Sequence, residues 1–270
     1  MRQATIGIVG YGAVGRSLHR LFGDDAVTFD ADGTDAQRQA INACTCAFVC
    51  VPTPIGQEGA CDTSVVEQSV RWIQAPLIVI RSTIPPGTTD RLRRQTHKRI
   101  VFQPEYIGET PAHPLADVRS HNFIVLGGSP ADTSAVADLY KRYYHSEIRF
   151  YFTNSLTAEV AKYMENSFYA VKVTFCNEFY GIAEAHGVDY NELREVWLAD
   201  PRISRDHTFV HPDDRGFGGK CLPKDVCAII ASSVQHGHAP RLLQAVADVN
   251  EDYRRDDPAH EPYRRKVRER

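Results

Sequence analysis

Short apolar runs alternate with helix-like patterns along the first part of the chain. The runs lie at residues 5–9, 26–29, 47–51, 77–80, 100–102, 122–126 and 149–152. Leu18, Leu21 and Phe22 have helical spacing after the first run, and residues 131–144 favour a helix after the sixth. Buried strands that alternate with helices are typical of a mostly parallel sheet with helices on both faces. We therefore predict a doubly wound α/β fold for residues 1–153.

The pattern changes to purely helical spacing beyond residue 153. Apolar side chains recur roughly once per helical turn through residues 155–186, at Leu156, Val160, Met164, Val171, Phe175, Phe179 and Ile182. Gly187 ends this long helix, Asp189 begins the next one, and residues 241–253 favour another. These features predict a second, all-α domain over residues 154–256. Residues 257–270 are a charged mixture that we expect to form a disordered tail.

The composition indicates an ordinary globular protein. The 270 residues carry a net charge of −3 and are 43% hydrophobic, which allows two domains with separate cores. The near-balanced charge does not support a nucleic-acid partner, and no apolar run is long enough to span a membrane. The first residues enter a strand without the pattern of a signal peptide. The seven cysteines form neither a disulfide framework nor a zinc motif, so we expect reduced thiols and a cytoplasmic protein.

The first strand runs directly into a glycine-rich turn. Its sequence, Gly10-Tyr11-Gly12-Ala13-Val14-Gly15, has the spacing of a dinucleotide-binding motif. The glycines allow a tight turn and the close approach of a pyrophosphate to the N-terminus of the following helix. The second strand ends at Asp30, whose carboxylate can accept hydrogen bonds from the adenosine ribose and would repel a 2′-phosphate. The sequence therefore predicts NAD, rather than NADP, as the cofactor.

Polar residues follow three further strands. Thr53 lies in Val51-Pro52-Thr53-Pro54, Thr83 follows the fourth strand, and Glu105 lies in Pro104-Glu105-Tyr106-Ile107. Ligands of open α/β sheets bind beyond the carboxyl ends of the strands. Any one of these residues could be ordinary loop polarity, but their repetition at one edge predicts a shared site.

The stretch Gly216-Phe217-Gly218-Gly219-Lys220-Cys221-Leu222-Pro223-Lys224-Asp225 predicts a reactive cysteine. Pro223 suits the start of a helix, which would place the sulfur at a helix N-terminus, where a thiolate is favoured. Lys224 and Asp225 add a cation and a carboxylate within one turn. The alternative is a glycine turn followed by a buried, inert thiol.

The long helix carries a polar face formed by Glu159, Lys162 and Asn166. A surface Glu–Lys pair is one explanation of this spacing. The amide of Asn166 in mid-helix, among apolar neighbours, favours instead a polar face that looks onto a site.

These motifs, in this order over residues 5–255, resemble the UDP-glucose/GDP-mannose 6-dehydrogenase family. They include the glycine turn, Ser82-Thr83-Ile84-Pro85, the Glu159/Lys162/Asn166 helix and, most specifically, the glycine–cysteine stretch. The resemblance implies a Rossmann-type NAD-binding domain followed by a central helical domain like that of 6-phosphogluconate dehydrogenase. It also implies a homodimer built on the long helix.

The resemblance further implies that the C6 alcohol of a nucleotide sugar is oxidised to a carboxylate, with two NAD reduced per turnover. Cys221 would form a thiohemiacetal and then a thioester, Lys162 and Asn166 would hold the oxyanion, Asp225 and Thr83 would act on the water, and Glu105 would transfer protons. The implied cofactor residues are Gly10, Gly12, Ala13, Val14, Gly15, Asp30, Val51, Pro52, Thr53, Thr83 and Lys224. The implied substrate residues are Glu105, Tyr106, Ile107, Lys162, Asn166, Arg202, Phe217, Gly218 and Gly219. Arg202 would reach the substrate of a neighbouring subunit.

The sequence departs from the family pattern in three places. Residues 30–46 are short, so we expect one helix–strand unit of the cofactor domain to be absent. The loop 204–215 is longer than usual and carries His207, His211, Asp213 and Asp214, which we expect to face solvent rather than bind a metal. Family members also continue into a second α/β domain that grips the nucleotide, and we expect this chain to be a short form without it. Two alternatives therefore stay open: a related dehydrogenase of another sugar or a hydroxy acid, and a non-catalytic NAD-binding remnant with a regulatory or scaffolding role.

Overall fold

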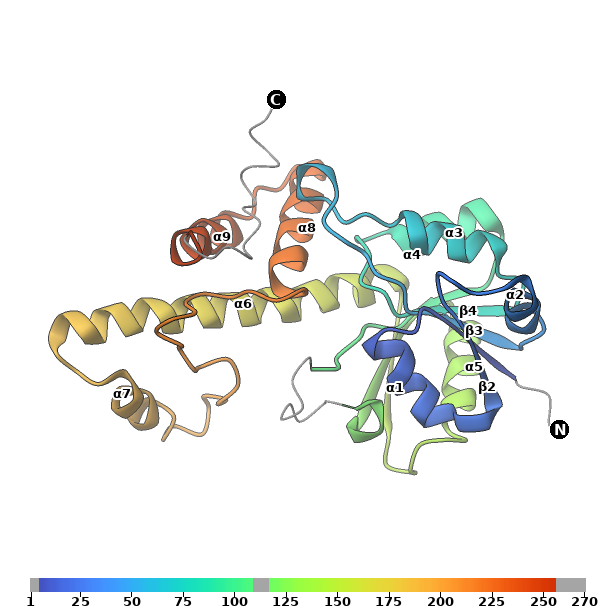
Figure 1. The fold of residues 1–270 in the computed structure, drawn as a ribbon, viewed down its shortest axis with the longest axis horizontal. Coiled ribbons are helices and arrows are strands. Elements are labelled where there is room, and N and C mark those ends of the chain that lie inside the picture. The colour runs from blue at the N-terminus through green and yellow to red at the C-terminus, as the bar shows by residue number, and fades with distance from the viewer. Residues whose placement is uncertain (1–4, 109–116, 256–270) are drawn as a thin grey trace. The chain divides into compact units, whose positions relative to one another are not determined.

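The computed structural model of the chain describes residues 5–108 and 117–255. The chain divides into two compact units (Figure 1). The first contains the residues up to Pro54 together with Asp62–Lys162, and the second contains Ile55–Cys61 together with the residues from Tyr163 onward. The division between Lys162 and Tyr163 falls inside the long helix, whereas the predicted domain boundary, between residues 153 and 154, lies before that helix. The predicted tail at residues 257–270 lies outside the described residues.

The first unit is built on one seven-stranded sheet with the order β2-β1-β3-β4-β5-β6-β7. The strands are β1 (Ile6–Val9), β2 (Ala26–Phe29), β3 (Cys46–Val49), β4 (Leu77–Ile80), β5 (Ile100–Phe102), β6 (Phe123–Gly127) and β7 (Arg149–Thr153). All neighbouring strands are parallel except β5 and β6, which are antiparallel. The predicted mostly parallel sheet is confirmed, because each predicted apolar run overlaps one of these strands.

Helices cover both faces of the sheet. They are α1 (Ala13–Phe22), α2 (Asp35–Asn42), α3 (Ser64–Trp72), α4 (Thr88–Thr96) and α5 (Pro130–Tyr140), with short 3₁₀ turns η1 (Gly23–Asp25) and η3 (Val118–Ser120). Side chains of α2, α3 and α4 pack in the core on one face, such as Val66 of α3. Side chains of α1 and α5 pack in the core on the other, such as Leu18 of α1. The doubly wound arrangement is therefore confirmed.

The connection from β2 to β3 is short. Residues 31–45 hold one helix, α2, and no strand, so β2 forms an edge of the sheet. Thr34 caps α2 by accepting a hydrogen bond from the Gln37 amide at 3.3 Å, while the Gln37 side chain accepts one from the Thr34 amide. A Rossmann sheet usually has one more strand outside β2. The shortened spacing after Asp30 thus coincides with a narrower sheet.

The second unit is helical. It contains most of α6 (Ser155–His186), together with α7 (Tyr190–Trp197), α8 (Leu222–Gln235), α9 (Arg241–Tyr253) and the 3₁₀ turn η2 (Gln57–Gly59). Asp189 caps α7 by accepting a hydrogen bond from the Glu192 amide at 2.9 Å, as its spacing predicted. A small core joins α6, α8 and α9. Within the described residues, no helix is both long enough and apolar enough to cross a bilayer.

Candidate active site

The glycine turn between β1 and α1 is closely packed at two positions and open at a third. Gly10 has φ +92°, and a Cβ there would lie 2.5 Å from the Cys50 carbonyl oxygen. A Cβ on Gly15 would lie 2.0 Å from the Gly10 carbonyl oxygen. At Gly12, by contrast, no described residue beyond its chain neighbours comes within 4 Å of where a Cβ would be. The turn therefore brings α1 close to the sheet and leaves free space at the start of the helix.

This free space suits a dinucleotide. No side chain caps α1, so the first amides of the helix can donate to a pyrophosphate. The exposed Asp30 carboxylate accepts hydrogen bonds from the amides of Tyr11 at 3.2 Å and Ala31 at 2.9 Å, which hold it beside the glycine turn. Its position is suitable for the hydroxyls of an adenosine ribose.

The loops after β3 and β4 are tied together. Ser82 donates a hydrogen bond to the Val51 carbonyl oxygen at 2.7 Å. Thr53 is buried and Thr83 is half-buried. The predicted cofactor residues Val51, Pro52, Thr53 and Thr83 thus lie on two loops that a hydrogen bond joins at the carboxyl edge of the sheet.

Glu105, after β5, is held by a buried arginine that the sequence analysis did not assign. Arg81 lies at the end of β4, is 3% exposed and donates to one oxygen of the Glu105 carboxylate. The other oxygen accepts from the amides of Tyr106 at 2.7 Å and Ile107 at 2.6 Å. Burial acts to lower the pKa of Arg81, but the Glu105 carboxylate, together with Tyr140 and Cys50, raises that pKa overall. Proton transfer by Glu105 would therefore require one of these hydrogen bonds to open.

Lys162 lies beside Glu105's neighbour, Tyr106. Its ammonium is 5.2 Å from the centre of the Tyr106 ring, a cation–π distance, and the lysine is buried. The Tyr106 ring in turn contacts Phe123 at 5.1 Å between centres. Three predicted substrate residues, Glu105, Tyr106 and Lys162, are thus brought together within the first unit.

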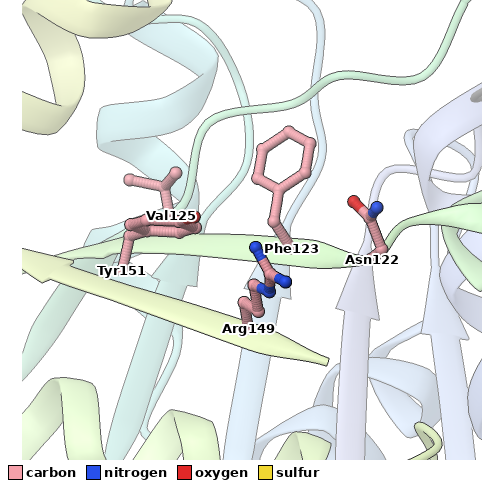
Figure 2. Close-up of a pocket in the computed structure, with 5 residues that line it drawn as sticks. All are labelled: Asn122, Phe123, Val125, Arg149 and Tyr151. Carbon is pink, nitrogen blue, oxygen red and sulfur yellow. The ribbon is translucent and has the colours of Figure 1, made fainter. Parts of the chain in front are cut away.

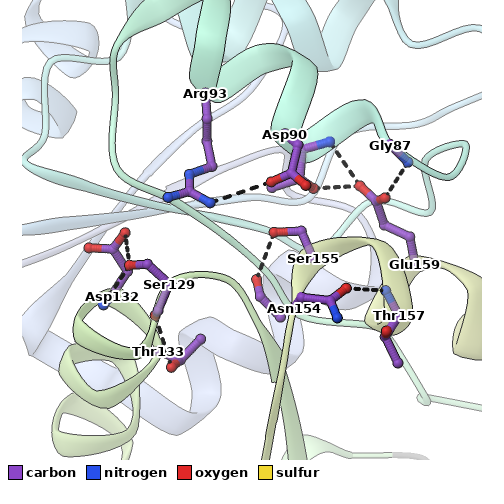
Figure 3. A network of polar contacts seen from close by, with 12 residues as sticks. Gly87, Asp90, Arg93, Ser129, Asp132, Thr133, Asn154, Ser155, Thr157 and Glu159 are labelled. Atoms are coloured by element: carbon purple, nitrogen blue, oxygen red, sulfur yellow. Dashed lines mark hydrogen bonds and ion pairs between the residues drawn. The ribbon is translucent and has the colours of Figure 1, made fainter.

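Glu159 does not form the surface ion pair that its spacing allowed. It is fully buried, and its carboxylate accepts hydrogen bonds from the Gly87 amide at 2.6 Å, the Thr89 amide at 2.8 Å and the Thr89 hydroxyl at 2.6 Å (Figure 3). These contacts cap the N-terminus of α4. Burial raises the pKa of Glu159, although the hydrogen bonds from Thr89 and Gly87 oppose that shift. Glu159 therefore joins α6 to α4.

Cys221 lies at the N-terminus of α8, as the sequence predicted, and is exposed. One turn later the Asp225 carboxylate, 1% exposed, accepts hydrogen bonds from Asn166 at 2.5 Å and from Lys224 at 2.5 Å. The Asp225 amide also donates to the Cys221 carbonyl at 3.0 Å. The helical unit thus joins a carboxylate, an amide and an ammonium by hydrogen bonds, one helical turn after the thiol.

Other thiols are less suited to nucleophilic chemistry. Burial raises the pKa of Cys44 to about 11, and burial with the nearby Glu105 raises that of Cys50 to about 12, although Arg81 acts to lower it. A thiol needs its thiolate form to attack a carbon. The exposed thiol at the start of α8 is the better candidate.

The glycines before Cys221 are approached by side chains of α9 and of Arg254, the residue that follows it. Gly216 has φ +79°, and a Cβ there would lie 2.5 Å from the Asn250 side-chain oxygen. A Cβ on Gly218 would lie 2.9 Å from the Arg254 guanidinium carbon. Asn250 accepts from the Phe217 amide at 2.6 Å and donates to its carbonyl at 3.0 Å. The positive φ and the close approach of Asn250 therefore explain Gly216 by packing within the protein, whereas the neighbour of Gly218 is the end of a flexible arginine side chain.

Two predicted substrate residues, Phe217 and Arg202, contact other parts of the helical unit rather than the hydrogen-bonded groups around Asp225. The Phe217 side chain is buried in the core formed by α6, α8 and α9. Arg202 is 87% exposed and pairs with Asp200 at 2.6 Å. In the loop 204–215, His207 stacks on Tyr169 at 4.2 Å. In residues 5–108 and 117–255, no group of three or more His, Cys, Asp or Glu side chains could hold a metal ion.

Both units match known domains of a single family. Residues 24–144 match the NAD binding domain, and residues 156–252 the central domain, of the UDP-glucose/GDP-mannose dehydrogenase family. The chain belongs to this family. NAD is accordingly the cofactor of the first unit, in agreement with the glycine turn and Asp30.

Relatives and solved structures in the family cover most of this chain. The chain is 32% identical to UDP-glucose 6-dehydrogenase of Pseudomonas aeruginosa, over 74% of this chain and 47% of that protein. It is 34% identical to UDP-glucose 6-dehydrogenase AglM of Haloferax volcanii, over 76% and 51%. It therefore spans about half the length of these relatives. The structure of a UDP-glucose dehydrogenase from Pyrobaculum islandicum superposes with a TM-score of 0.80 at 26% identity, over 93% of this chain and 68% of that one.

Proposed function

We propose that the chain catalyses the NAD-dependent oxidation of the C6 alcohol of a nucleotide sugar to the carboxylate, through a covalent intermediate on Cys221. The observation that carries the proposal is the setting of this thiol. It is exposed at a helix N-terminus, one turn before the Asp225 carboxylate that Lys224 and Asn166 hold. Family membership supports both the cofactor and the substrate class.

When bound, NAD supplies the acceptor for the hydride that leaves the sugar carbon. The Cys221 thiolate adds to the aldehyde formed by the first oxidation, giving a thiohemiacetal. The second oxidation converts this adduct into a thioester, which water hydrolyses to the carboxylate and the free thiol. The covalent bond retains the reactive aldehyde between the two oxidations.

Charged and polar side chains stabilise these steps. Lys162 and Asn166, one turn apart on α6, offset the negative charge on the sugar oxygen. Asp225 and Thr83 orient the water that attacks the thioester, and Glu105 accepts or returns a proton. Lys224 holds Asp225 in place. All seven cysteines are free thiols in the structure, and a reducing compartment such as the cytoplasm would keep Cys221 active.

The yield of NADH per sugar tests this proposal. Wild-type protein with limiting UDP-glucose, UDP-N-acetylmannosamine or GDP-mannose is expected to form two NADH for each molecule of its substrate. One NADH per sugar would contradict the double oxidation. No NADH from any of the three, despite NAD binding, would exclude the proposed reaction and favour a non-catalytic role.

A hydroxy-acid dehydrogenase is the second candidate. The fold superposes on 3-hydroxyisobutyrate dehydrogenase of Mycobacterium tuberculosis with a TM-score of 0.71 over 98% of both chains, but at 14% identity. That likeness concerns the fold alone. A single oxidation of a small hydroxy acid needs no covalent sulfur intermediate, so the polar cluster beside Cys221 favours the first candidate.

We also propose a homodimer formed through α6. An apolar stripe follows one face of this helix, with its residues three, four or seven positions apart: Leu156, Val160, Met164, Phe168, Phe175, Phe179 and Ile182, all exposed in the single chain. A second copy of the same helix, related by a two-fold axis, would cover this stripe. Arg202, also exposed, is then available to a neighbouring subunit.

Met164→Glu is expected to convert the dimer into a monomer at about ten micromolar, because it puts a charge in the centre of the stripe. Sedimentation velocity measures the change. Val196→Glu on α7 is the matched control, since Val196 is 71% exposed and Met164 is 74% exposed, but Val196 lies outside the stripe. A wild-type protein that sediments as a monomer, or a dimeric Met164→Glu, would contradict the proposal.

A further inference from the structure

The ribbon formed by β6 and β7 extends beyond the end of β5. Strand β6 runs antiparallel to β5, and the two strands pair only through their last residues, Gly127 and Phe102. The beginning of β6 therefore continues past the carboxyl end of β5, and β7 follows it in parallel register. Because Phe123 contacts the Tyr106 ring, the start of this ribbon lies beside the loop that carries Glu105 and Tyr106.

One face of this ribbon carries a pocket. Phe123 pairs with Arg149 and Val125 pairs with Tyr151, so the four side chains project from the same face (Figure 2). The alternate residues of β6 face the core against α1 and α5 instead. Together with Asn122, the four side chains line a pocket of about 370 Å³. This volume is in the range of small-molecule sites.

The pocket combines aromatic rings with a free positive charge. No carboxylate among the described residues pairs with the Arg149 guanidinium. An arginine of this kind can bind a phosphate through two parallel hydrogen bonds. The rings of Tyr151 and Phe123 offer flat apolar faces, and the Asn122 carboxamide offers both a donor and an acceptor. A flat heterocycle attached to a diphosphate matches this combination.

We propose that the pocket binds the nucleoside diphosphate part of the substrate. The base would lie against Tyr151, the diphosphate would pair with Arg149 beside Phe123, and the sugar would extend towards Tyr106. Lys162 lies over that tyrosine ring, so the sugar would end near one of the proposed oxyanion groups. This inference rests on the proposed function for the choice of a nucleotide sugar, and it adds where its nucleotide is held.

The affinity for UDP and GDP, measured by calorimetry without NAD, tests the pocket independently of turnover. Arg149→Gln is expected to weaken the binding of the preferred diphosphate at least about tenfold, while the affinity for the free nucleoside stays the same, because only the phosphate contact is lost. Tyr151→Ala is expected to weaken both ligands, because it removes the stacking surface. The matched control is Phe152→Ala, an exposed aromatic on the opposite face of β7, which should bind like wild type. Unchanged NAD affinity would show that each variant is folded.

Any of three results would contradict the proposed nucleotide site. The first is a wild type that binds neither UDP nor GDP at millimolar concentration, and the second is that the Arg149→Gln and Tyr151→Ala proteins bind them as tightly as wild type does. The third is a Phe152→Ala protein whose affinity for the diphosphate is as low as that of these two variants. The proposed function fails by a different result. If diphosphates bind in an Arg149-dependent manner but no nucleotide sugar is oxidised, the pocket stands and the reaction is wrong. If two NADH form per sugar with the same KM in Arg149→Gln, the reaction stands and the pocket is wrong.

Discussion

Replacing Cys221 with serine is expected to lower the rate of carboxylate formation by a factor of about a thousand or more, and to reduce the NADH yield to one or none per sugar. A serine hydroxyl at the start of α8 has a far higher pKa than a thiol, so it offers almost no anion to attack the aldehyde. A thioester can no longer form, and the second oxidation has no covalent substrate. The measurement is the NADH yield at limiting nucleotide sugar, together with mass spectrometry of the protein for a sugar adduct.

The control is Cys227→Ala, which removes a buried thiol from the same helix. It should keep the wild-type yield and adduct, because no role is proposed for this thiol. A Cys221→Ser protein that still forms two NADH per sugar would rule out the covalent route, whatever its rate.

Replacing Arg81 with methionine is expected to lower the free energy of unfolding by about 3–5 kcal/mol, the usual effect of removing one partner from a buried ion pair. The Glu105 side chain is only 12% exposed, so its charge would be left buried without the guanidinium. Urea unfolding measures the change. Arg119→Met is the matched control, since the exposed Arg119 pairs with Asp117 and its loss should change the free energy of unfolding far less.

The double variant Arg81→Met/Glu105→Gln separates the ion pair from simple packing. Removing the stranded carboxylate charge should restore at least half of the lost stability, because the main penalty is the uncompensated charge. If the double variant is no more stable than the single one, the pair does not contribute as described, and Arg81 acts only through its volume.

Strands β1, β3, β4 and β5 could be predicted from the sequence because each is a continuous apolar run that is buried along its whole length, and β2, β6 and β7 because apolar residues still dominate them. The helices α2, α3 and α4 could not be delimited in this way. In α4 the only large aliphatic residue is Leu92, and its N-terminus is capped by Glu159 from a distant helix. No local spacing reports a cap that comes from so far along the chain.

In the candidate site, too, features that depend on local contacts could be predicted from the sequence, whereas those that depend on distant contacts could not. The glycine turn and the position of Cys221 at a helix start depend on neighbouring residues, and both were readable. The Arg81–Glu105 pair and the two hydrogen bonds between Asn250 and Phe217 join residues far apart in sequence, so no pattern indicated them. The same limit applies to Gly216: a glycine indicates that another group approaches closely, but not that this group is the Asn250 side chain.

The capping of α4 by Glu159 also delays the completion of this helix during protein synthesis. The carboxylate lies 72 residues after the Gly87 amide that it binds. At a synthesis rate of about 5–20 residues per second, α4 would wait roughly 4–14 seconds on the ribosome before its cap exists. During that interval its first amides can be satisfied only by water. The sheet unit therefore completes its folding only after the first turns of α6 have been synthesised.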